Sequence, residues 1–149
     1  MPSLNIFRRK KKEKEAEKKV SKTLLEELCG NDDQLHRVLS RILLLNPSLT
    51  MKEGMATHAM RAQEYEKNKD YTRARVAYQV AGEIAIYEGK LSHAQKFFKR
   101  TAEIAPDYEN KDVLEFFLKK ENAEKALAIA QEYYTRTGKL GESKEDTSG

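Results

Sequence analysis

The chain has 149 residues, of which 39% are hydrophobic and 35% charged, with no Trp and one Cys. This length suits one domain with tails, and the single Cys29 excludes an intramolecular disulfide or a zinc site built on paired cysteines. Residues 1–22 carry nine Lys and Arg against three Glu, whereas the other residues carry 19 basic and 21 acidic groups. The net charge of +4 therefore belongs to one arm, and a nucleic-acid-binding fold in the body is disfavoured.

Three segments of different composition define the domains that we expect. Residues 1–22 form a flexible basic arm, residues 23–138 an all-α helical-hairpin domain, and residues 139–149 a disordered polar tail. No apolar run approaches the roughly 20 residues of a membrane span, so with its single cysteine the protein is expected to be cytoplasmic. Abundant Lys and Glu with only five Gln are typical of a thermophile.

The first two predicted helices lie between residues 23 and 45. One ends at Gly30, a residue that favours helix C-termini, and Asn31–Asp33 then caps the next. Apolar residues follow the spacing of one helix face in this second segment: Leu35, Val38, Leu39, Ile42 and Leu45. Asn46-Pro47-Ser48 is expected to break it.

Three longer helices are predicted next. Thr50 and Glu53 have the spacing of a capping box, and the helix that they open should end near Asn68. The next helix runs from Tyr71 to Gly89 and the third from Leu91 to Pro106. Their buried stripes contain the following small and aromatic residues: Ala74, Tyr78, Ala81, Ala85, Leu91, Ala94, Phe98, Ala102 and Ala105.

A last pair of helices is predicted before the polar tail. Val113 to Leu118 forms a short apolar segment, Glu121-Asn122 is taken as a turn, and Ala123 to Tyr134 forms the final helix before Gly138. Alternating apolar and polar residues, the pattern of a β-strand, do not extend over a useful length. The fold class predicted is therefore all-α, with about six helices in stacked antiparallel hairpins.

The spacing of small and aromatic residues resembles the tetratricopeptide repeat. One match comprises Tyr78, Gly82, Gly89, Leu91, Ala94, Phe98, Ile104 and Pro106, and an earlier one comprises Tyr65, Asn68, Tyr71, Ala74, Tyr78 and Ala81. The resemblance covers residues 51–138 and implies a right-handed α-superhelix that binds proteins. The chain departs from the family because Ala74 and Ala94 are 20 residues apart, not about 34, and the usual Trp is absent.

A second family is similar to the same residues. Three helices joined by short turns, with Ala94 to Ile104 at the end of the third, resemble the MIT domain of the ESCRT machinery. That resemblance implies a module that binds tails of membrane-remodelling filaments. The additional hairpin after Pro106 is not expected in an MIT domain, so the longer helical stack is preferred.

Catalytic and metal sites are not expected. His36, His58 and His93 lie on different predicted helices without ligands at suitable spacing, and Cys29 is expected to pack as a small apolar group. We therefore predict no enzyme activity, no cofactor, no bound metal and no small-molecule substrate.

The aromatic pairs Phe97-Phe98, Phe116-Phe117 and Tyr133-Tyr134 bear on the docking surface. Adjacent helical residues point about 100° apart, so one of each pair should be core and the other should meet a neighbouring helix or a groove. A buried stripe explains these pairs, and a groove for a ligand is the alternative. The groove would be lined by Gln63, Gln79, Glu83, Ile86, Val113, Phe117 and Lys120.

The function predicted is a protein-protein interaction scaffold that binds a partner peptide or helix. An alternative uses the basic arm, with Arg8, Arg9, Lys10, Lys11 and Lys12 as contacts to an anionic membrane surface or to nucleic acid. Each basic residue near an anionic membrane contributes about 1 kcal/mol, and contacts with nucleic acid would be sensitive to salt. For the arm taken alone, a solubilising tail is the preferred reading, and the membrane and nucleic-acid contacts are its alternatives.

Overall fold

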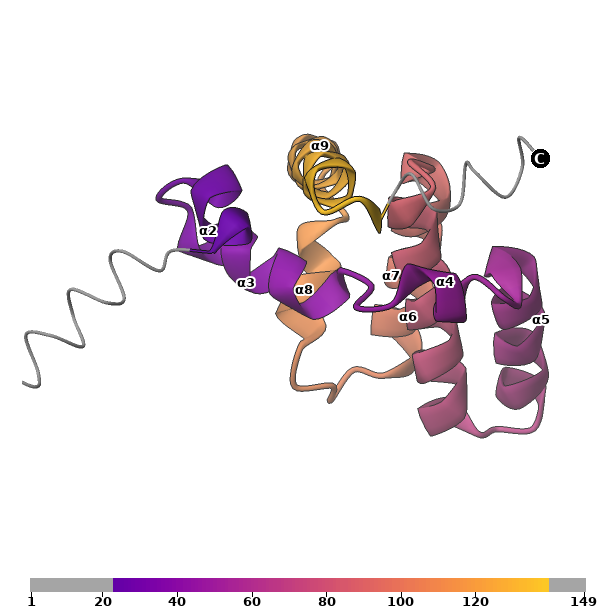
Figure 1. Cartoon of the computed structure of the whole chain (residues 1–149). Coiled ribbons are helices and arrows are strands. Elements are labelled where there is room, and N and C mark those ends of the chain that lie inside the picture. Colours follow the sequence, from indigo (N-terminus) through magenta and orange to yellow (C-terminus); the bar gives the residue numbers. More distant parts are fainter. Residues whose placement is uncertain (1–22, 140–149) are drawn as a thin grey trace, which may run out of the picture.

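The computed structural model describes residues 23–139, and every regular element within them is an α-helix (Figure 1). The eight helices are α2 (Leu24–Cys29), α3 (Asp33–Ile42), α4 (Pro47–Thr50), α5 (Gly54–Lys67), α6 (Tyr71–Tyr87), α7 (Leu91–Ile104), α8 (Lys111–Phe116) and α9 (Lys120–Arg136). The predicted all-α stack of helical hairpins is confirmed for this part of the chain. Short elements such as the four-residue α4 raise the number above the expected six.

Two tight turns make α5, α6 and α7 consecutive antiparallel neighbours. Lys69 adopts a positive φ of 59° in the first turn, and the Asp70 carboxylate then accepts a hydrogen bond from the backbone N–H of Arg73 to cap α6. Gly89 adopts a φ of 76° in the second turn, a conformation that costs glycine little. The predicted ends of these helices near Asn68, Gly89 and Pro106 are confirmed.

The predicted small and aromatic residues form the contacts between these helices. Ala74 and Ala94 are fully buried, which allows close approach of their helices. Phe98 is also fully buried and lies between α6 and the end of α8, because it contacts Gly82 and its ring centroid is 4.8 Å from that of Phe117. Phe98 therefore joins three helices.

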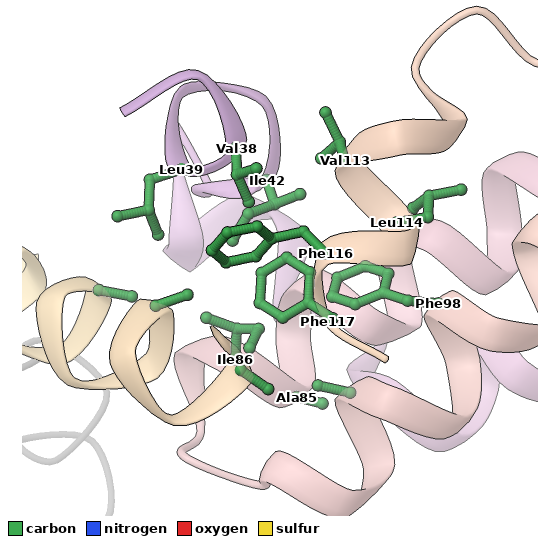
Figure 2. Packing of buried hydrophobic residues seen from close by; sticks show 14 of the residues in the cluster. Val38, Leu39, Ile42, Ala85, Ile86, Phe98, Val113, Leu114, Phe116 and Phe117 are labelled. Atoms are coloured by element: carbon green, nitrogen blue, oxygen red, sulfur yellow. The ribbon is translucent and has the colours of Figure 1, made fainter. Parts of the chain in front are cut away.

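The N-terminal helices pack at the opposite end of the molecule from α5, against α8 and α9 (Figure 1). Figure 2 shows Val38 and Ile42 of α3 beside Phe116 of α8. Two exposed ion pairs cross the same contact, from Arg37 to Asp112 at 3.2 Å and from Lys125 to Asp32 at 3.3 Å. Residues 24–42 are thus part of the helical domain.

The adjacent aromatic residues divide their contacts between neighbours. Phe97 is half-buried and stacks on Tyr78, while Phe98 is core. Phe116 and Phe117 are both buried, because α8 lies between helices and the two rings meet different ones, α3 and α7 (Figure 2). Two residues that are adjacent in the sequence of a helix can both be buried where other elements cover the helix on more than one side.

Helix α3 ends earlier than predicted. It stops at Ile42, because Leu43 adopts an extended conformation, and the side chain of Leu45 is 90% exposed instead of lying on the apolar face. Leu44 is buried in its place. Pro47 then opens α4, where its missing N–H costs nothing.

Two local predictions about helix boundaries were wrong. Thr50 belongs to α4, and α5 begins at Gly54 without a capping box, because Glu53 pairs instead with Arg61. The pair Glu121-Asn122 lies inside α9, and the chain turns earlier, at residues 117–119.

Candidate docking groove on helices α5 and α6

One face of α6 is covered by α9 only along its C-terminal half. The rings of Tyr87 and Tyr134 meet edge to face with centroids 4.9 Å apart. The Gln131 side-chain amide donates hydrogen bonds to the carbonyls of Ile86 and Tyr87, at 2.8 and 3.0 Å. These contacts fix α9 across the end of α6.

The described residues cover the N-terminal half of this face only in part. Thr72, Val76 and Val80 recur every four residues along it, and Val76 remains 47% exposed. Together with α5 they form an open groove of about 310 Å³. Its lining residues are His58, Arg61, Tyr65, Thr72, Arg73, Val76, Ala77 and Val80.

Positive charge flanks this apolar floor from both helices. Arg61 of α5 holds the carboxylate of Glu53 through both of its terminal nitrogens, and this hydrogen bonding keeps the pKa of Glu53 below its usual range. Arg73 of α6 lies 3.6 Å from Asp70 and has its guanidinium 5.9 Å from the centroid of the Tyr65 ring. The groove lining contains two arginines and a histidine but no carboxylate.

Glu83 lies farther along α6, between Val80 and Tyr87. Its side chain is half-buried, and desolvation raises its pKa from the ordinary 4.5 to about 8. The hydroxyl of Tyr134 accepts a hydrogen bond from the backbone N–H of Leu44 at 2.8 Å, and its pKa is raised chiefly by burial, with a contribution from the charge of Glu83. The protonated form of Glu83 is therefore favoured at neutral pH.

No family model, curated protein or solved structure matches this chain.

The seven residues predicted to line a groove are not brought together as one. Ile86, Val113 and Phe117 have exposed fractions of 1% or less and are core residues, so they do not face a partner in this conformation. The others are distributed as follows: Gln63 borders a separate depression with Glu66, Lys67 and Tyr78, Gln79 accepts a hydrogen bond from Arg75, Glu83 is half-buried, and Lys120 is exposed beside Glu124. The contact residues Arg8 to Lys12 lie outside the described residues.

The residues that line the observed groove were missed by sequence reasoning, although a signal for them exists. Thr72, Val76 and Val80 form a second apolar row on α6, beside the row of Ala74, Tyr78 and Ala81. A helix with two such rows needs more than one neighbour.

A polar cluster joins α5, α6 and α7 at another face. The Glu66 carboxylate accepts hydrogen bonds from the Tyr78 hydroxyl at 2.9 Å and from two nitrogens of Arg100, which also pairs with Glu103. These bonds, those of Arg100 first, keep the pKa of Glu66 below its usual range. Through these hydrogen bonds, the Glu66 carboxylate clamps α5 to α6 and α7.

The histidines and the cysteine occupy unrelated positions. His93 is exposed, His36 and His58 are half-buried, and residues 23–139 contain no cluster of three potential metal ligands. Cys29 is buried, as predicted, and burial raises the pKa of its thiol. Over the same residues, none of the helices combines the length and apolarity needed to cross a bilayer.

Proposed function

We propose that this chain is a non-enzymatic protein-interaction scaffold of tetratricopeptide-like type that works in the cytoplasm. In this proposal the groove between α5 and α6 holds a peptide or helix of a partner protein. The observation that carries it is the apolar N-terminal half of the α6 face, which the described residues cover only in part, whereas α9 covers the other half.

The energetics of the groove suit reversible binding. Burying a Val side chain completely contributes about 1.5 to 3 kcal/mol, so finishing the burial of Val76, which is 47% exposed, adds on the order of 1 kcal/mol. Similar contributions from Val80 and Tyr65 offset only part of the entropy lost on association. This groove alone would therefore bind a partner more weakly than the micromolar range, which corresponds to about −8 kcal/mol, so other surfaces of the scaffold would have to contribute.

A second candidate function rests on the charge of the arm. Residues 1–22 carry a net charge of +6, which favours a tether to an anionic membrane surface or to nucleic acid. Its proposed contacts are Arg8, Arg9, Lys10, Lys11 and Lys12. The two functions assign the partner contacts to different parts of the sequence, residues 58–80 for the groove and residues 1–22 for the arm. One experiment can therefore separate them.

The test is affinity capture from a lysate with quantitative mass spectrometry, using full-length variants. Val76→Glu places a charge on the groove floor, and Met60→Glu is the matched control because Met60 is 68% exposed on α5 but does not line the groove. A third variant replaces the five basic residues of the arm by Gln. Proteins lost with Val76→Glu but kept by the other two support the scaffold, whereas ligands lost only with the arm variant support the tether.

A further inference from the structure

The groove is long enough for a short helix. Its floor runs from Thr72 to Val80 along α6, a rise of about 12 Å at 1.5 Å per residue. The same face of α6 continues to Tyr87, where Tyr134 and Gln131 of α9 contact it. A partner helix of about two turns would match the length of the floor.

The arginines that line the groove favour a partner segment with negative charge. Arg61 of α5 and Arg73 of α6 both line the groove, with side chains 48% and 72% exposed. Their own partners, Glu53 and Asp70, are also solvent-accessible, so exchanging these ion pairs for intermolecular ones costs little. Carboxylates that flank the apolar stripe of a docked helix would meet these two arginines.

We infer that the groove binds an acidic amphipathic helix of a partner protein, with an apolar stripe on Val76 and Val80 and flanking Asp or Glu on Arg61 and Arg73. This inference rests on the proposed function and adds the chemistry of the occupant. The chain's own basic arm, with a net charge of +6, has the wrong sign to occupy the groove.

The binding test uses two labelled synthetic peptides and fluorescence anisotropy. Both peptides carry the same Leu stripe at i, i+3, i+4 and i+7, one with Glu and the other with Lys at every flanking position. All measurements use the full chain with Arg8 to Lys12 replaced by Gln, so that the arm does not attract the acidic peptide. We expect the Glu peptide to bind about threefold to thirtyfold more tightly than the Lys peptide, since two exposed ion pairs change sign.

Two double variants and one control variant test whether this preference for the Glu peptide arises in the groove. Arg61→Glu with Arg73→Glu should reverse it, and Arg61→Gln with Arg73→Gln should abolish it, which keeps the test valid if the reversal destabilises the fold. Arg136→Glu is the control, because Arg136 is an exposed arginine on α9 that pairs with Glu132 of the same helix. Raising the salt concentration to about 0.5 M should shrink the preference, since exposed charges are screened.

The outcomes separate this inference from the proposed function. Equal binding of the two peptides, lost with Val76→Glu, would leave a docking groove but overturn the acidic partner. A preference for Glu that persists in both double variants would also overturn it. If neither peptide binds while lysate proteins are still lost with Val76→Glu, the scaffold stands and the helical occupant is wrong. If light scattering instead detects a dimer of the chain, the groove would be assigned to self-association.

Discussion

Phe98 lies directly against Gly82, so that a β-carbon on Gly82 would come within 2.6 Å of Cε1 of the Phe98 ring. The ring has no room to retreat, because it is fully buried and packs on Phe117 from the other side. Gly82 is therefore required by the close approach of α6 and α7, although glycine is unfavourable inside a helix.

The substitution Gly82→Ala should destabilise the fold by about 1 to 2 kcal/mol. The overlap with Phe98 costs about 1 to 3 kcal/mol, and the better helix propensity of Ala returns up to about 1 kcal/mol. Urea unfolding of the full chain measures the difference.

A double-mutant cycle identifies the cause of this loss. Phe98→Leu removes the ring that meets the new methyl group, so Gly82→Ala should be neutral or stabilising in that background. Additive free energies of unfolding for the two substitutions would contradict the proposed contact.

Tyr134→Phe should loosen the connection between α3 and α4. The variant removes the oxygen that accepts the backbone N–H of Leu44, and an unsatisfied buried donor costs about 1 to 3 kcal/mol. Hydrogen exchange of the Leu44 amide should accelerate more than that of amides within α3. Tyr133→Phe, at the half-buried neighbour, is the control, and equal effects of the two variants would disprove the assignment.

Glu83→Gln should make the protein more stable at alkaline pH. The folded-state pKa of about 8 lies above the ordinary 4.5, so the protonated side chain is favoured in the fold and wild-type stability falls as pH rises from about 4.5 through 8. Gln removes this dependence, and after allowance for partial exposure the gain at pH 8 should be on the order of 2 kcal/mol. Thermal unfolding from pH 5 to 9 tests it, with exposed Glu64→Gln as control; parallel curves for wild type and Glu83→Gln would refute it.

Arg100→Ala should weaken the clamp between α5 and α7 by about 1 kcal/mol near neutral pH. The pKa of Glu66 is lowered in the fold, so the stability that this carboxylate contributes is present above its ordinary pKa and is lost as pH falls through the folded value. The difference between wild type and variant should therefore shrink in acid, measured by urea unfolding at about pH 7 and pH 3. Arg136→Ala, which removes an ion pair within one helix, should have a smaller effect; an effect of the same size would show that the clamp adds nothing.

The fold class and the long helices could be predicted because local signals agree with the packing there. Tight helix contacts were predicted correctly from Ala74, Ala94 and Phe98. Helix ends were predicted correctly from Gly89 and Pro106. Predictions failed where a contact between residues far apart in the sequence overrides a local sequence signal. Leu45 continues the apolar spacing of α3, but the chain leaves the helix earlier and Tyr134, 90 residues away, takes the Leu44 N–H.

The candidate groove could not be predicted from spacing alone. The row formed by Thr72, Val76 and Val80 continues in Glu83 and Tyr87. Only the structure reveals that α9 covers one half of this row, while the described residues leave Val76 in the other half exposed. Conversely, Ile86 and Phe117 were expected at a groove because the sequence does not state that α9 packs at Ile86 and that Phe98 of α7 packs on Phe117.

The placement of α2 and α3 against α8 and α9 has a consequence for the nascent chain. Residues 24–42 leave the ribosome before the helices that bury them, and α9 emerges almost a hundred residues later. Their apolar residues thus remain without partners until α8 and α9 have been translated, while α5, α6 and α7 can already pair with each other; these residues are Leu35, Val38, Leu39 and Ile42. The last step of folding is then the docking of the first helices onto the last, and a ribosome stalled near residue 110 would hold a chain with an unfinished core.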